Sequence, residues 1–444
     1  MKILKKQILF LIFSLLLFNF IFSNDDLKNQ VELTFDECYK IAYENNRDFK
    51  IAKLDKQIAE AQLQKAAAAY GPTISLMGSY QPVYKASIIE IPAGVFGPTP
   101  ISFPMGVQNY YSARVSLSQP LFTFGKVTFG FLLAKENYEI ALLNYKKAEE
   151  KLKLDVISAF YGALIAQEMS KVQQETLKAN EEYLRVTRTK FKNGQASNFD
   201  VLQAQVQYAN TKPEVKKAED GYKLALLNLK NTLGISFDKE IVLKGAPDYK
   251  KLQMTYDEIK KKFSEKNDDR EIAEHINNIG DLQSKLQMSL LLPSIALSAN
   301  YNYYSDERDF HIENEYWNSS WDVSVGLQWT FFDSFKNVAS IKEAMANAEK
   351  AKINKESMDN YSEIQLEVLY TSLEQSAQII EAADELIKQA EEGYRIAQTS
   401  YKNGLIQSVD LLNAETGLLR AKTNYLNALY NYTTTIQKLQ NFLE

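Results

Sequence analysis

The chain has 444 residues, of which 45% are hydrophobic and 24% charged, a composition that supports ordered structure and excludes wholesale disorder. Its formal net charge of −5 argues against nucleic acid as a partner. Cys38 is the only cysteine, which excludes an intramolecular disulfide framework.

The first 23 residues have the composition of a signal peptide. Three lysines within the first six residues precede an apolar run that ends at Phe22, and Ser23 offers a small residue for cleavage. The run is long enough that an uncleaved anchor helix is the alternative interpretation. Export from the cytoplasm is expected under both interpretations, so we treat residues 1–23 as a targeting segment.

Both halves of the remaining chain begin with the same helix-start signal. Thr34 is followed three residues later by Glu37, and Thr255 by Glu258, which is the spacing of a capping box. We expect a short helix after each box. A longer helix should follow and end near a proline, at roughly 48–69 and 271–291.

Alternation of apolar and polar residues then predicts four strands, at roughly 73–84, 111–124, 294–304 and 321–332. Strands of about ten residues span a bilayer when tilted, and aromatic residues near their ends suit its two interfaces. The alternation places Arg114 on the polar face. An antiparallel sheet packed on a helix in a soluble protein is the alternative. The segments between the paired strands, 85–109 and 306–318, are expected to be loops.

Two very long helices follow the strand pairs. No proline interrupts 126–190 or 336–400, and a helix of that length reaches roughly 100 Å, which no globular core requires. Alanines and apolar residues recur at steps of three and four, as in helices that pack as coiled coils. Each long helix should turn and run back, giving helical hairpins at 126–233 and 334–442. Pro213 is expected to kink or restart the first return helix.

The tips of the two hairpins carry the same motif, 210 residues apart. The shared residues are Lys192, Asn193, Gly194 and Asp200 in one tip and Lys402, Asn403, Gly404 and Asp410 in the other. Each glycine is expected to accept the positive φ of a turn. The chain is therefore predicted to be internally duplicated, with a first repeat at 24–233, a linker at 234–254 and a second repeat at 255–444.

Four amphipathic strands are too few to close a membrane barrel, because the smallest barrels have about eight strands and lipid tolerates no open sheet edge. Three copies would supply about twelve strands around a lumen, whereas the eight of a dimer would be filled by their own side chains. The sequence thus predicts a trimer in which a membrane β-barrel continues into an α-helical barrel.

In these features, namely the capping boxes, strand pairs, unbroken helices and glycine-containing tips, the chain resembles the TolC-type outer-membrane efflux proteins. The resemblance covers essentially the whole chain after residue 23. It implies a trimeric channel-tunnel with a twelve-stranded barrel in the outer membrane and a helical barrel in the periplasm. It also implies a passive exit duct for efflux or type I secretion, joined by a periplasmic adaptor to an inner-membrane transporter. The absence of a nucleotide-binding motif agrees with a passive role.

The resemblance also implies a gate at the second tip. In the family a Tyr and an Arg form a network that closes the tunnel, and two Asp residues one turn apart ring the pore. Tyr401 matches the Tyr and Asp410 the first Asp, whereas Ile406 stands in place of the Arg and Asn413 in place of the second Asp. We therefore expect one acidic ring, which would favour cations.

Each of these site assignments has a structural alternative. Asp200 and Asp410 both fall in the first turn of a return helix, where a carboxylate is stabilised by the helix dipole. The resemblance favours a pore role for Asp410 and leaves Asp200 structural. It further implies that the tips contact the adaptor, through the Lys-Asn-Gly residues 192–194 and 402–404; a solvated turn is the alternative.

Catalysis is not expected. His275 and His311 are the only histidines, and neither has the spacing of a metal ligand. Cys38 has no partner that would make it a nucleophile, so we expect no enzyme activity, cofactor or metal. Two other functions compete with a duct: a periplasmic coiled-coil tether without a pore, and the adaptor itself. A tether does not explain the strands, and an adaptor would have one hairpin with β-rich domains.

Overall fold

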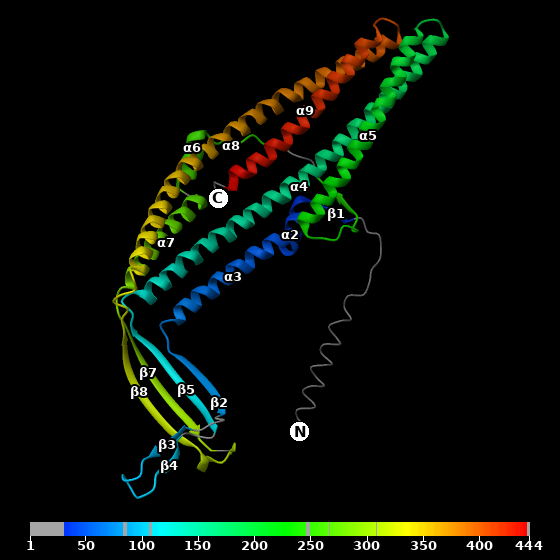
Figure 1. The fold of residues 1–444 in the computed structure, drawn as a ribbon. Helices are drawn as coiled ribbons and strands as arrows, with labels where there is room; N and C mark the ends of the chain where they lie inside the picture. The colour runs from blue at the N-terminus through cyan, green and yellow to red at the C-terminus, as the bar shows by residue number, and fades with distance from the viewer. Residues whose placement is uncertain are drawn as a thin grey trace, which may run out of the picture. The chain divides into compact units, whose positions relative to one another are not determined.

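The computed structural model describes residues 31–82, 87–105, 109–245, 249–265, 267–307 and 309–441, so the expected signal peptide lies outside the described part. Figure 1 labels its elements. Two compact units are present: one contains 1–46, 152–251 and 375–434, and the other 47–151, 252–374 and 435–444. Both units therefore draw on both halves of the sequence. Within the described ranges, no helix has the length and apolarity needed to cross a membrane.

The second unit contains a four-stranded antiparallel sheet in the order β2-β5-β7-β8. Its strands are β2 (Thr73–Pro82), β5 (Asn109–Phe122), β7 (Ser294–Ser305) and β8 (Asn318–Gln328). The sheet joins strands from both halves of the sequence through β5 and β7. β2 and β8 are its edges, and in the described part of the chain neither edge has a second neighbour in this sheet.

The register places apolar residues in rows on one face of this sheet. Leu76 lies opposite Val115, Val115 opposite Tyr301, and Tyr301 opposite Trp321. Directly opposed residues of antiparallel strands point to the same side. Among the described residues this face is uncovered: Leu76 is 75% and Trp321 76% exposed. An exposed apolar surface of this kind marks a place where another apolar phase or protein is met.

The opposite face of the sheet is polar and cross-linked by side chains. Arg114 donates from Nε to Asn302 Oδ1 over 2.6 Å, and Asn300 donates to Asp322 over 2.9 Å. The hydroxyls of Ser79 and Ser112 lie 2.7 Å apart. The expected position of Arg114 on the polar face is confirmed.

The segment 85–109, expected to be a loop, instead contains a short hairpin. Strands β3 (Ser87–Ile91) and β4 (Ile101–Met105) pair antiparallel. The intervening segment, rich in proline and glycine, supplies the turn. Because these residues are typical of loops, the two short flanking strands could not be recognised from the sequence pattern. The other expected loop contains a short 3-10 helix, η1 (Asn314–Tyr316).

Helices form the rest of the second unit. They are α3 (Arg47–Ala68), α6 (Tyr256–Glu265), α7 (Asp268–Ser289) and the first parts of α4 (Lys126–Lys192) and α8 (Lys336–Lys402). Gly280 of α7 lies so close to α8 that an added Cβ would stand 2.9 Å from the Cα of Ala348. Arg270 of α7 pairs with Asp359 of α8 at 3.1 Å. Helix α7 is thus fixed along α8.

The first unit contains the ends of the long helices, their return helices α5 (Asn198–Leu233) and α9 (Ser408–Asn441, to residue 434), and α2 (Phe35–Asn45). β1 (Val31–Leu33) pairs in parallel with β6 (Ile241–Leu243), so the linker expected at 234–254 contains a strand. Helix α5 runs through Pro213 without restarting. Both Pro213 and Ala209, whose carbonyl loses its partner, are exposed to water.

The capping boxes predicted for the two helix starts are confirmed. The Thr34 and Thr255 backbone N–H groups donate to the carboxylates of Glu37 and Glu258, over 2.8 and 2.9 Å. In turn, the backbone N–H groups of Glu37 and Glu258 donate to the hydroxyls of Thr34 and Thr255, over 3.4 Å in both boxes. Each box satisfies backbone donors that a helix start otherwise leaves without partners.

Candidate functional site

The candidate site lies at the tips of two helical hairpins, hairpin 1 (α4 and α5) and hairpin 2 (α8 and α9), within the first unit. Gly194 and Gly404 have φ of 72° and 75°, which confirms the expected turn glycines. The same closing bonds recur: Gln195 N–H donates to Lys190 O over 2.8 Å, and Leu405 N–H to Ser400 O over 2.9 Å. The two tips therefore have the same local backbone.

Above the tips, an apolar cluster joins the two hairpins. Its buried members are Tyr183, Leu184, Ala204, Ala397, Tyr401 and Leu411. Ile406 packs against it and is partly buried. The cluster takes residues from α4, α5, α8 and α9, so the ends of all four helices are held together by burial of apolar surface.

Tyr401 is the polar centre of this cluster and is only 6% exposed. Its hydroxyl lies 2.8 Å from Thr187 Oγ1. Because the Thr187 hydroxyl donates to the Tyr183 carbonyl over 2.8 Å, Tyr401 is the donor and Thr187 the acceptor. Lys190 Nζ lies 4.3 Å from the centre of the Tyr401 ring and donates to the Tyr401 carbonyl oxygen. We call these bonds the Tyr401 contact.

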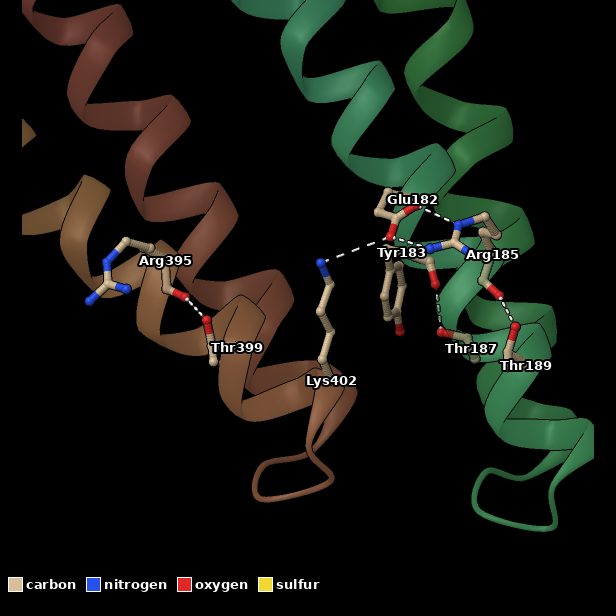
Figure 2. Close-up of polar contacts among 8 residues, drawn as sticks. All are labelled: Glu182, Tyr183, Arg185, Thr187, Thr189, Arg395, Thr399 and Lys402. Atoms are coloured by element: carbon tan, nitrogen blue, oxygen red, sulfur yellow. Dashed lines mark hydrogen bonds and ion pairs between the residues drawn. The ribbon is translucent and has the colours of Figure 1, made fainter.

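Three weaker polar contacts accompany the Tyr401 contact. Ser408 Oγ lies 3.4 Å from both Asp200 Oδ1 and Gln203 Oε1. Lys402 Nζ lies 3.9 Å from Glu182 Oε1, and Figure 2 shows Glu182 between Lys402 and Arg185. The Arg185 guanidinium donates two bonds to Glu182, and this hydrogen bonding lowers the pKa of the Glu182 carboxyl.

The two tip aspartates differ in their surroundings. Asp200 accepts bonds from the Ser197 hydroxyl at 2.7 Å and backbone N–H at 2.9 Å, and these hydrogen bonds lower the pKa of its carboxyl. Asp410 is exposed and accepts one bond, from the Gln407 N–H at 3.1 Å. Both carboxylates therefore cap a helix. Asn413, one turn beyond Asp410, is exposed as well.

The tip residues assigned to adaptor contact lie on the surface. Lys192, Asn193, Lys402 and Asn403 are all exposed. They leave the apolar cluster above them undisturbed and are accessible to a partner.

Several residues of the site were missed from sequence. Four further side chains bridge the hairpins, yet no local pattern pairs them with Tyr401, Lys402 or Asp200: Thr187, Lys190, Glu182 and Ser408. One signal was present: Tyr183, Thr187 and Lys190 follow at steps of four and three and so share a helix face. That face is the one turned to hairpin 2.

A pocket further along the hairpins contains an unusual carboxyl. Glu415 lies beside Val172, Thr176 and Tyr394, and its Oε1 is buried without a hydrogen-bond partner among the described residues. Burial raises the pKa of Glu415 to about 7, and that of Tyr394 to about 12. In the described part of the chain, no group of acidic, histidine and cysteine side chains is arranged to hold a metal ion.

A family model described as outer membrane efflux protein matches residues 38–235 and 279–443. Among curated proteins, the probable efflux pump outer membrane protein TtgC of Pseudomonas putida is 25% identical over 257 residues, which are 58% of this chain and 51% of TtgC. The antibiotic efflux pump outer membrane protein ArpC of Pseudomonas putida gives the same values. The chain thus spans about half the length of the curated relatives it matches.

Solved structures have the same fold at low identity. The Campylobacter jejuni CmeC outer membrane channel superposes with a TM-score of 0.75 at 16% identity, covering 92% of this chain and 85% of CmeC. The outer membrane protein VceC of Vibrio cholerae gives 0.74 at 16% identity, covering 92% and 95%. A membrane protein from Pseudomonas aeruginosa gives 0.77 at 18% identity, covering 92% and 93%.

Proposed function

Because the chain belongs to the outer membrane efflux protein family, we propose that three copies form a channel-tunnel that is the passive exit duct of a tripartite efflux or type I secretion system. The match confirms the TolC-type resemblance, and the family is one of channels and not of enzymes. Membership also supports an outer-membrane location.

The observation that carries the proposal is the four-stranded sheet with one exposed apolar face and two open edges. An open edge exposes unpaired backbone groups, which lipid does not tolerate. Pairing β8 of one copy with β2 of the next would remove both edges, and three copies would close a barrel of about twelve strands. The apolar face would then meet outer-membrane lipid, and the polar face with Arg114 would line the lumen.

The hairpins extend the duct into the periplasm in this proposal. Packing of apolar residues and alanines at steps of three and four supports a helical barrel continuous with the strands. The exposed tips, Lys192 to Gly194 and Lys402 to Gly404, would bind a periplasmic adaptor, which joins the channel to an inner-membrane transporter. The curated relatives are named as efflux pump components, which supports the same role here.

The second tip would act as the gate. The Tyr401 contact holds hairpin 2 against hairpin 1 and supports a closed tip. Ile406 packs against the cluster, so apolar packing would stand where the family has a charged network. Asp410 would supply one carboxylate ring of three, while Asn413 would add a neutral ring one turn away.

Imaging and conductance test the proposal. Single particles of the detergent-extracted protein should show threefold hollow cylinders, and the protein should conduct ions in planar bilayers. Solid rods of one or two copies that stay soluble without detergent would contradict it and favour a tether. The tether is disfavoured now because it gives no role to the exposed apolar face of the sheet.

A further inference from the structure

The two hairpin ends match in an unexpected set of residues. Between 181–194 and 391–404, the identical positions are two glutamates, an arginine, a threonine and the Lys-Asn-Gly tip. We call them the matched residues: Glu181, Glu182, Arg185, Thr189, Lys192, Asn193 and Gly194, with Glu391, Glu392, Arg395, Thr399, Lys402, Asn403 and Gly404. All are exposed except Glu182, which is half-buried.

The buried positions of the same stretches have diverged. Thr187 of hairpin 1 corresponds to Ala397 of hairpin 2, and both are buried. The buried Tyr401 of hairpin 2 corresponds to Phe191 of hairpin 1, which is 45% exposed. Packing constrains buried residues most strongly, whereas exposed helix positions usually accept many side chains. Identity concentrated at exposed positions, with only Glu182 half-buried, therefore favours a contact that both hairpins make with something outside their own core.

The matched side chains also have the same geometry. At about 100° per residue, positions 181, 182, 185, 189 and 192 fall within roughly one third of the helix circumference. Arg185 donates to Glu182 over 2.6 and 2.7 Å, and Arg395 donates to Glu392 over 2.7 and 2.7 Å. Thr189 and Thr399 each donate to the carbonyl four residues earlier over 3.0 Å. Each Arg thus fixes its Glu in one orientation.

One contact made by the matched residues is present within the chain. Lys402 of hairpin 2 reaches Glu182 of hairpin 1, as Figure 2 shows. Glu392 of hairpin 2 corresponds to Glu182 of hairpin 1, and Lys192 of hairpin 1 corresponds to Lys402 of hairpin 2. Within the part of the chain that the structure describes, Glu392 pairs with Arg395, and no ion pair joins it to Lys192.

We propose that a second copy of this chain completes the set: Lys192 of the partner subunit pairs with Glu392, as Lys402 pairs with Glu182 within one chain. This inference rests on the proposed trimer. In a closed ring of two alternating hairpins, hairpin 2 must also touch hairpin 1 of the next copy. Because the two hairpins carry the same matched residues, the contact between copies can use the same Glu–Lys pair as the contact within a copy.

The Tyr401 contact is not repeated between copies. The position of Tyr401 is taken by Phe191, that of Thr187 by Ala397 and that of Lys190 by Ser400. Neither the hydroxyl bond nor the lysine bond can form with these side chains. The contact between copies is therefore held by exposed ion pairs, which contribute little stability each.

Thiol cross-linking tests the pairing. Lys192→Cys and Glu392→Cys are combined in the full-length protein in detergent and treated with a short bifunctional thiol reagent. Cys38 is fully buried, so the introduced cysteines are the exposed thiols. We expect covalent dimers and trimers on a denaturing gel, and none from either single variant.

Glu182→Cys with Lys402→Cys is the matched control, which should cross-link within one chain and leave the mass of a monomer. Native mass spectrometry of the same samples reports assembly. Trimers that yield only monomers on the denaturing gel, while the control reacts, would overturn the pairing and leave the proposed duct standing. A monomeric native mass for the unmodified protein would overturn the duct and the pairing together.

Discussion

The Tyr401 hydroxyl donates to Thr187 Oγ1 over 2.8 Å, and this bond joins helices whose residues lie 214 positions apart. The Thr187 hydroxyl in turn donates a hydrogen bond to the Tyr183 carbonyl oxygen. Both side chains are buried, so the bond is shielded from competing water. It is the most protected polar link between the two hairpin tips.

Tyr401→Phe should weaken the closed tip. The substitution keeps the ring and its packing against Tyr183 but removes the donor to Thr187, at a cost of about 1 kcal/mol. Single channels in planar bilayers should open about fivefold more often, since 1.4 kcal/mol corresponds to a factor of ten. Tyr361→Phe, at an exposed position of α8, is the control and should behave as the unmodified channel. Equal opening of the two variants would exclude Tyr401 from the gate.

Installing the missing bond between copies should have the opposite effect. Phe191→Tyr combined with Ala397→Thr would supply a hydroxyl pair where neighbouring copies meet, and lower the open probability in the same recordings. Each single substitution provides only one half of the bond and serves as a control. A double variant that opens as often as its parents would show that Phe191 and Ala397 do not face each other between copies.

Local sequence patterns predicted the parts of this fold that depend on neighbouring residues. The Lys-Asn-Gly tips, the capping boxes at Thr34 and Thr255, and the polar position of Arg114 follow from spacing along one segment. Pairing between hairpins depends on which helix faces meet in space, and no periodicity encodes it. Tyr401 was therefore recognised by resemblance, while its partners Thr187 and Lys190 were not.

Short elements were missed for a different reason. β1 and β6 have three residues each, too few for alternation to stand out from the linker. The strand β8 ends at Gln328, before the aromatic residues that suggested an end near 332. Beyond β8, Ser334 and Phe335 adopt positive φ of 56° and 65° and form the turn into α8. The turn could not be predicted because no glycine occupies these positions.

Asp410→Asn should reduce the cation selectivity of the pore. It removes one carboxylate per copy while keeping an oxygen that can accept the Gln407 N–H bond. Reversal potentials measured across a salt gradient should move toward zero. Asp200→Asn is the matched control, because the Asp200 carboxylate is engaged by Ser197, and its reversal potential should stay that of the unmodified pore. If the selectivity of Asp410→Asn is unchanged, Asp410 caps the helix and does not set the selectivity of the pore.

The two faces of the sheet should tolerate charge unequally. Val325→Asp places a carboxylate on the apolar face, at a cost of up to about 2 kcal/mol near the middle of a bilayer. Ser324→Asp places it on the polar face, which would line the hydrated lumen of the proposed barrel. We expect loss of heat-resistant trimers from outer-membrane fractions for the first variant only. The pair Leu297→Asp and Ser298→Asp repeats the comparison on β7, and equal losses on both faces would contradict the assignment of a lipid-facing side.

Glu415 should make the stability of the hairpins depend on pH. Burial raises its pKa from 4.5 to about 7, so the folded chain binds more protons than the unfolded chain between these values. The resulting stabilisation is complete below pH 4.5 and is lost as the pH rises through 7. Because the side chain is half-buried, we expect about 1 to 2 kcal/mol and not the full shift.

The other charged or titratable side chains lining this pocket are Glu175 of α4, Tyr394 of α8 and Lys422 of α9. Lys422 Nζ is 3.1 Å from Glu391 and 3.9 Å from Glu175, whereas Glu415 Oε1 has no hydrogen-bond partner among the described residues. Glu415→Gln should therefore match the unmodified protein at pH 5 and melt at a higher temperature at pH 8. Glu385→Gln, at an exposed site of α8, controls for loss of charge alone. If Glu415→Gln and the unmodified protein have equal melting temperatures at both pH values, Glu415 is not the source of the pH dependence.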